Sequence, residues 1–153
     1  MPVNKGKAFE QQFKKDWRTC FPQSFIYRLP DQVSGYHNSK NVSDFICFED
    51  GHLYLLDTKS IKGASIPIVN LSQLDMMQAY SDVPECLCGF IVWFYDKDTV
   101  VFISSEQAKK YRKQGLKSIR FDDENVLVLP GEKKRTFINT DYSKLKEVWN
   151  EGI

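Results

Sequence analysis

The sequence lacks the features that mark membrane, secreted and multidomain proteins. No apolar run approaches the roughly 18 residues of a membrane-spanning helix, and the opening stretch MPVNKGKAFE has no apolar signal core. We therefore expect a cytoplasmic protein. No repeat, low-complexity tract or Pro/Gly-rich linker interrupts the 153 residues, a length typical of one domain. The prediction is a single domain over residues 1–153.

Soft metal ligands are also scarce. The four cysteines include no C-x-x-C pair and are accompanied by two histidines, so no zinc site is expected. Cys86 and Cys88 stand two apart in an apolar segment, which places both on one face of a strand. We predict that they are buried free thiols.

Charge of one sign is not in excess, because the net charge is +1. Net charge alone therefore makes no case for nucleic acid. Its distribution is more informative, since residues 107–120 carry six basic side chains and no acid. Such a stretch is typical of a phosphate-binding surface or of a solvated helix face. The candidate DNA-binding residues in it are Lys109, Lys110, Arg112, Lys113, Lys117 and Arg120.

What the sequence does contain is the hydrophobic periodicity of an α/β domain. Phe9, Phe13 and Trp17, spaced four apart, predict a first helix that Asn4 caps and that ends before Pro22. Further helices are expected at 70–80, 105–114 and 141–150. Strands are expected at 24–29, 42–48, 52–60, 86–95, 99–104 and 125–129. This order predicts a mixed sheet between helices.

The most informative segment is the pair of strands at 42–48 and 52–60. Asp50-Gly51 between them indicates an antiparallel hairpin. Asp57 and Lys59 are two apart and point to one face of the second strand, and the hairpin brings Asp44 beside them. The unbroken apolar run before Asp57 predicts a central strand that is covered on both faces.

Two carboxylates and an ammonium group at one end of a sheet suit phosphodiester hydrolysis. Asp44 and Asp57 are hard oxygen ligands for Mg²⁺, with Mn²⁺ as a substitute, and the Thr58 backbone carbonyl could add a ligand. Lys59 could orient the attacking water or stabilise developing negative charge. The alternative is a surface ion pair between Asp57 and Lys59, with Asp44 as an unrelated turn residue.

An ordered set of motifs resembles the RecU-type Holliday-junction resolvases of the PD-(D/E)XK nuclease superfamily. The motifs are NKGKAFE, VSDF, LLDTKS, IPIVNLSQLDMM and GLKSIR, which together run from Asn4 to Arg120. The resemblance implies a restriction-endonuclease-like fold with an αβββαβ core. It also implies a homodimer that cuts branched double-stranded DNA, and the short chain suggests a phage-encoded version.

The resemblance implies roles for single residues. Asp44 matches the first metal-binding Asp, Asp57 replaces the Glu of the family's E-x-K, and Lys59 matches the catalytic Lys. Glu10 matches a first-helix Glu near the metal, and Gln73 matches a helix Gln beside the active centre.

Glu10 and Gln73 also have structural alternatives. Glu10 could form an i,i+4 ion pair with Lys14. Gln73 could form a capping box with Asn70.

Two departures from the family concern DNA recognition. The segment 27–43 offers only a short arm in place of a long stalk, and no strongly basic N-terminal extension is present. Tyr36 and His37 in this arm could stack on exposed bases, although an ordinary surface loop is the alternative. Two other functions stay open: a PD-(D/E)XK nuclease with another substrate, of restriction or homing type, or a catalytically silent DNA-binding module.

Overall fold

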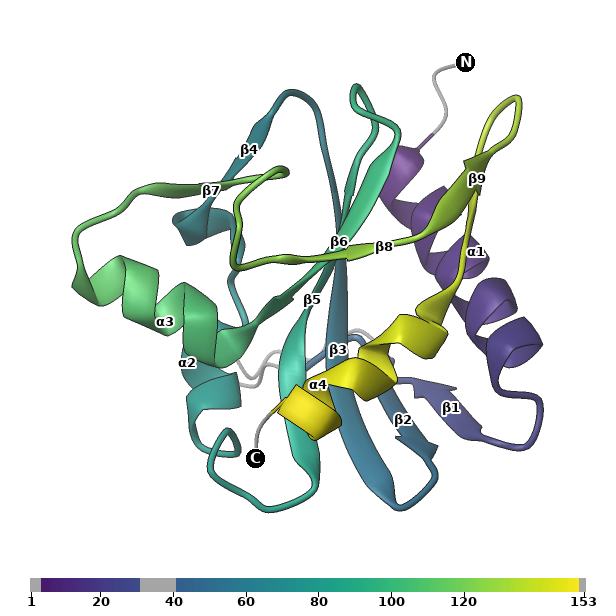
Figure 1. Cartoon of the computed structure of the whole chain (residues 1–153), viewed down its shortest axis with the longest axis horizontal. Coiled ribbons are helices and arrows are strands. Elements are labelled where there is room, and N and C mark those ends of the chain that lie inside the picture. Colours follow the sequence, from purple (N-terminus) through teal and green to yellow (C-terminus); the bar gives the residue numbers. More distant parts are fainter. Residues whose placement is uncertain (1–3, 31–40, 152–153) are drawn as a thin grey trace.

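A computed structural model describes residues 4–30 and 41–151, and a mixed sheet forms the centre of this part (Figure 1). The strand order is β1-β2-β3-β5-β6-β8. Strands β3 and β5 are parallel, and the other neighbours in the sheet are antiparallel. The strand bounds are β1 (Phe25–Arg28), β2 (Phe45–Glu49), β3 (His52–Ile61), β5 (Cys86–Phe94), β6 (Thr99–Ser104) and β8 (Leu127–Leu129).

Helices cover both faces of the sheet. Alternation along β5 separates two cores, because Phe90 and Val92 belong to one cluster and Ile91 and Trp93 to the other. Helix α1 (Lys5–Cys20) and the 3₁₀ helix η2 (Tyr142–Lys146) pack on the Ile91 side, whereas α2 (Leu74–Gln78) and α3 (Ser105–Lys113) pack on the Phe90 side. The order α1, β1, β2, β3, α2, β5 is the predicted αβββαβ core, so the predicted fold class is confirmed.

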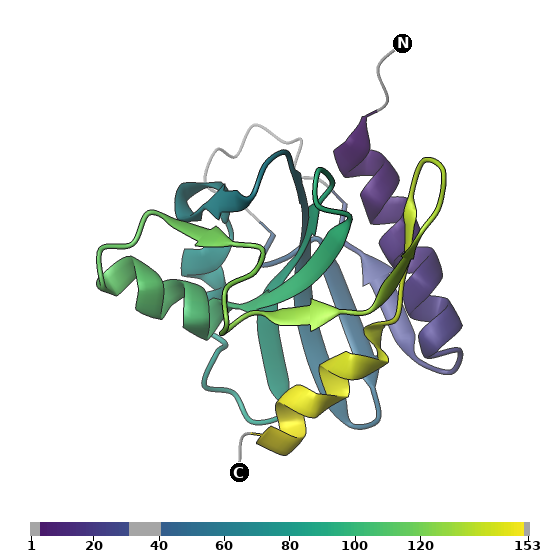
Figure 2. The same cartoon turned by 45° about the horizontal axis from the view of Figure 1, so that its top comes forward.

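The smaller elements lie around this core (Figure 2). Two short antiparallel pairs are formed by β4 with β7 and by β9 with β10. Their bounds are β4 (Ser65–Pro67), β7 (Ser118–Arg120), β9 (Gly131–Lys133) and β10 (Ile138–Thr140), and the remaining helices are η1 (Ile68–Asn70) and α4 (Glu147–Glu151). No described helix is long and apolar enough to cross a membrane.

The first helix and the hairpin form as the sequence predicts. The Asn4 side chain accepts a hydrogen bond from the Lys7 backbone N–H, and Phe9, Phe13 and Trp17 are buried. The hairpin turns at Asp50 and Gly51, whose φ angles of 52° and 78° suit an Asp-Gly turn. The central position of β3 between β2 and β5 is also confirmed.

Two predicted helices were wrong in type or extent. The segment 70–80 contains η1 and the short helix α2 instead of one helix. Ile68, Leu71 and Leu74 are all buried, and over so few residues a spacing of three fits a 3₁₀ helix as well as an α-helix. The segment 141–150 likewise begins as the 3₁₀ helix η2 and only then becomes α4.

Two further predictions concern the arm and the thiols. The arm expected at 27–43 is shorter, because Tyr27 and Arg28 belong to β1 and pair with Ile46 and Phe45 of β2. Residues 31–40, including Tyr36 and His37, lie outside the described part. Cys86 and Cys88 are buried free thiols, as predicted.

Gly89 in β5 permits close contact between strands β5 and β6. A Cβ atom there would lie 2.5 Å from a ring carbon of Phe102 and 2.6 Å from the Ile103 carbonyl oxygen. We expect Gly89→Ala to lower the free energy of unfolding by about 1–3 kcal/mol in urea titration, because the strand must shift. Gly6→Ala is the control: its Cβ would come no nearer than 3.5 Å to the Asn4 side chain, so stability should be unchanged or rise by up to about 1 kcal/mol. Equal effects of the two changes would contradict this account.

Candidate active site

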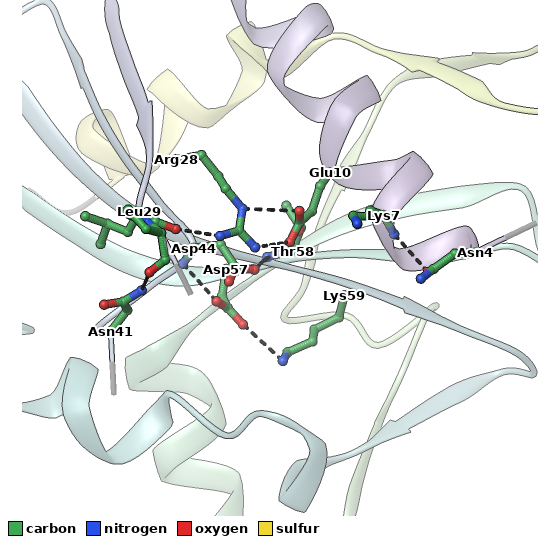
Figure 3. Close-up of polar contacts among 11 residues, drawn as sticks. Asn4, Lys7, Glu10, Arg28, Leu29, Asn41, Asp44, Asp57, Thr58 and Lys59 are labelled. Atoms are coloured by element: carbon green, nitrogen blue, oxygen red, sulfur yellow. Dashed lines mark hydrogen bonds and ion pairs between the residues drawn. The ribbon is translucent and has the colours of Figure 1, made fainter. Parts of the chain in front are cut away.

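The site forms beside the first residue of β2, where β3 continues beyond its pairing with β2 and remains paired with β5. Phe45 pairs with Leu56, so the residue before β2, Asp44, comes opposite Asp57. The Asp44 backbone N–H donates to Asp57 Oδ1 at 3.0 Å, and the Thr58 backbone N–H donates to Asp44 Oδ2 at 3.3 Å (Figure 3). Each aspartate therefore binds backbone of the opposite segment, which fixes both carboxylates at the end of the paired region.

Asp57 and Lys59 converge on one face of β3, as their spacing predicts. Lys59 Nζ lies 3.1 Å from Asp57 Oδ2. The Asp57 side chain is 0% exposed, whereas the Lys59 side chain is 25% exposed. A surface ion pair is thus the wrong interpretation, because the carboxylate of this pair lies in the protein interior.

The electrostatics of the pair favour a bound positive charge. Burial, and then the neighbouring Asp44 carboxylate, raise the pKa of Asp57 to about 7, and Lys59 offsets only part of this rise. Asp57 is therefore partly protonated near neutral pH, and a cation bound beside the two carboxylates would favour its ionised form.

Glu10 enters the same region from α1 but binds Arg28. The Arg28 guanidinium lies 2.9 Å (Nη2) and 3.3 Å (Nε) from the two carboxylate oxygens of Glu10. The pair with Lys14 is therefore the wrong alternative. The role of Glu10 as a metal ligand stays a prediction.

Arg28 is a site residue that the sequence patterns do not predict. It is the last residue of β1 and pairs with Phe45, the residue after Asp44. A lone charged residue at the end of the apolar segment SFIYRL was the available signal. The position of Arg28 beside Asp44 depends on the register between β1 and β2, which the sequence alone does not determine.

The predicted capping box at Gln73 does not form. Asn70 ends η1, and Gln73 precedes α2 without capping it through its side chain. The Gln73 side-chain amide oxygen instead accepts a hydrogen bond from the Ser72 hydroxyl at 2.8 Å. The role of Gln73 beside the active centre stays a prediction.

The predicted basic surface lies on and after α3. Arg112 forms an ion pair with Asp75 at 2.7 Å, and Arg120 forms one with Asp122 at 2.8 Å. Within residues 4–30 and 41–151, the other four predicted residues have no acidic partner; they are Lys109, Lys110, Lys113 and Lys117.

The donor set fits an ion that needs few protein ligands. No group of three His, Cys, Asp or Glu side chains in the described part could hold a metal by itself. Asp44 and Asp57 offer two adjacent carboxylates, and among the described residues the buried Asp57 Oδ2 is contacted by the Lys59 ammonium group at 3.1 Å but by no hydrogen bond of regular geometry. Mg²⁺ commonly binds one or two carboxylates together with water and substrate phosphate. The two aspartates therefore fit Mg²⁺ better than an ion that is fully enclosed by protein.

Comparisons with known proteins include a curated relative and a solved structure. No family model matches the sequence. The SPbeta prophage-derived uncharacterized protein YotM of Bacillus subtilis (strain 168) is 28% identical over 108 residues, which cover 65% of this chain and 54% of that protein. The chain thus spans about half the length of this curated relative.

A solved structure gives the second similarity. Hjc, a Holliday junction resolvase from Archaeoglobus fulgidus, superimposes with a TM-score of 0.49 and 9% identity over 66% of this chain and 78% of that one. The narrower resemblance to RecU-type resolvases stays a prediction, and function is inferred from the site itself.

The raised pKa of Asp57 predicts how stability depends on pH. Between pH 3.8, the ordinary pKa, and about pH 7, the folded state keeps a proton on Asp57 that the unfolded state has released. The unfolding free energy of the metal-free protein should therefore fall as the pH rises through this range. The contribution of Asp57 has a maximum slope of about 1.4 kcal/mol per pH unit and levels off above neutrality.

Urea titrations across this pH range measure the slope. Asp57→Asn should remove it, whereas Asp50→Asn, in the exposed turn of the same hairpin, should retain it. Parallel curves for Asp57→Asn and the unchanged protein would show that Asp57 does not titrate in this range.

Proposed function

We propose that this protein is a metal-dependent DNA endonuclease of the PD-(D/E)XK type. The observation that carries the proposal is the Asp44 and Asp57 pair, bound reciprocally to backbone, with Lys59 Nζ 3.1 Å from the buried Asp57. A purely structural ion pair would not need a second carboxylate opposite the first. Clustered carboxylates with a raised pKa are typical of functional sites.

Asp44 and Asp57 would hold Mg²⁺, or Mn²⁺ in its place, with the Thr58 carbonyl as a further candidate ligand. The bound ion would neutralise phosphate charge and lower the pKa of water. The protein prepares this function by fixing its ligands: the Thr58 N–H binds one oxygen of Asp44, and the Asp44 N–H binds one oxygen of Asp57. The ligands need little reordering when an ion arrives.

Lys59 contributes an ammonium group on the accessible side of the pair. Its side chain is partly exposed and contacts Asp57 Oδ2, so Nζ can meet a phosphate or a water molecule beside that carboxylate. There it would orient the attacking water or stabilise the negative charge that develops on the scissile phosphate. Arg28 holds Glu10 beside this centre and thereby contributes to the charge balance around it.

The substrate we propose is branched double-stranded DNA, resolved by a homodimer at four-way junctions. Resolution requires two symmetric incisions and each chain carries one candidate site, so a two-fold dimer matches the symmetry of the substrate. The basic side chains on and after α3 would contact phosphates.

The prophage origin of YotM supports a phage-encoded source. A catalytically silent DNA-binding module is disfavoured because Asp44, Asp57 and Lys59 are all present and converge.

Cleavage should require a divalent cation and the three site residues. We expect Asp44→Asn, Asp57→Asn and Lys59→Ala each to slow Mg²⁺-dependent cleavage at least about hundredfold. The aspartate variants lose a charged metal ligand, and the lysine variant loses an ammonium group that would stabilise the transition state. Circular dichroism should show folded variants. Asp50→Asn is the control, since Asp50 lies at the other end of the same hairpin, and it should cleave normally. Unchanged cleavage by the three variants would refute the site assignment.

A four-way junction should be cut in preference to a linear duplex of the same sequence. We expect sedimentation to show a dimer and cleavage to produce paired, symmetric nicks. A dimeric protein that cuts both DNAs equally would favour a nuclease with another substrate. A monomer that still makes paired nicks would contradict the proposed symmetry.

A further inference from the structure

The solvent-facing side of α1 carries a basic stripe that the catalytic site does not use. Lys7, Lys14 and Arg18 are spaced seven and four apart and therefore lie along one side of the helix. That side is opposite the buried stripe of Phe9 and Phe13. We define the α1 basic face by five residues, namely Lys7, Gln11, Lys14, Lys15 and Arg18.

The two acids of α1 do not neutralise this face. The Glu10 carboxylate binds Arg28. Asp16 is buried and accepts hydrogen bonds from the Thr140 backbone N–H and from Gln12. Within residues 4–30 and 41–151, no basic side chain of the α1 basic face forms an ion pair, so their charges are available to a ligand.

The β9–β10 hairpin extends this surface beside α1, and both views show the two elements side by side (Figures 1 and 2). Gln12 Nε2 lies 3.0 Å from Asn139 Oδ1 and ties the helix to β10. A shallow hollow between them is lined by Gln11, Lys15 and Thr136, among others. A second hollow, along the helix, is lined by Gln11, Lys14, Lys15, Arg18 and Thr19. Gln11 and Lys15 line both hollows, so the two adjoin on this side of α1, and we refer to them together as the groove.

The groove has the chemistry of a phosphate backbone site. Lysine and arginine supply charge, and glutamine and threonine supply neutral hydrogen-bond donors, as in protein contacts to DNA phosphates. Exposed Arg135 adds charge at the tip of the hairpin. From Lys7 to Arg18 the stripe is about 16 Å long.

An acidic hollow limits the groove on one side. Asp16, Glu132 and Asp141 line this hollow together with Thr19, which also lines the groove. Glu132 is paired with Lys134, but the exposed Asp141 carboxylate would disfavour a phosphate there, whereas the α1 basic face would attract one.

We propose that the α1 basic face and the tip of the β9–β10 hairpin bind the phosphate backbone of a DNA duplex arm. This surface is distinct from the one on α3, because α1 and α3 cover opposite faces of the sheet. Two separate basic surfaces on one chain suit a substrate with more than one duplex arm. The inference rests on the proposed action on DNA and names a second surface for it.

The test measures binding without cleavage. The full chain is titrated into a fluorescein-labelled linear duplex in EDTA at several salt concentrations, and anisotropy gives Kd. Lys14→Gln/Arg18→Gln should weaken binding about tenfold and reduce the slope of log Kd against log salt by about two, since each lost phosphate contact contributes roughly 0.9. Glutamine keeps high helix propensity, so α1 should remain folded. Arg135→Gln, outside the helix, should reduce the slope by about one.

The control removes equal charge next to the acidic hollow. Lys144→Gln/Lys146→Gln changes η2, which follows Asp141, and should bind within about twofold of the unchanged protein with the same slope. Equal weakening by both double variants, or none by Lys14→Gln/Arg18→Gln, would overturn the inference and leave the nuclease proposal intact. No DNA binding by the unchanged protein would overturn both.

Discussion

A carboxylate buried beside a second carboxylate is the constraint on which the rest of the site depends. Asp57 is fully buried, and Asp44 lies opposite it. Burial and like charge both oppose ionisation, whereas one ammonium group, from Lys59, favours it. Backbone N–H groups satisfy one oxygen of each aspartate. The two carboxylates carry more negative charge than the Lys59 ammonium group balances, and a hard cation would supply the missing positive charge.

The fold produces this constraint because β2 pairs with only the first part of β3. Strand β2 begins at Phe45, while β3 runs on beside the parallel strand β5 to Ile61. Buried side chains cover the paired strands on both faces, so Asp57 cannot move outward without disturbing the core. Helix α1 then joins the two functional regions: Glu10 reaches Arg28 near the aspartates, and the opposite side of the helix faces solvent with basic residues.

Elements are predictable from the sequence where one local pattern has one structural solution. The four-residue spacing of Phe9, Phe13 and Trp17 predicts α1, and Asp50-Gly51 predicts the hairpin that brings Asp44 to Asp57. Elements are not predictable where the patterns are short or where contacts depend on strand register. Ile68, Leu71 and Leu74 fit both helical periods within a few residues, and β4, β7, β9 and β10 are each three residues long. The Arg28 contact with Glu10 depends on strand order, which local patterns do not encode.

Net charge concealed the electrostatic character of the surface. The chain is nearly neutral at +1, yet many acids are engaged locally: Glu10 with Arg28, Asp75 with Arg112, and Asp122 with Arg120. Asp16 and Asp57 are buried. Because screening limits exposed charges to about 10 Å at moderate salt, a bound phosphate responds to nearby side chains and not to the total. In the proposed function, lysines on α1 and α3 that form no ion pair within the described residues would therefore attract DNA on both faces of a chain whose overall charge does not.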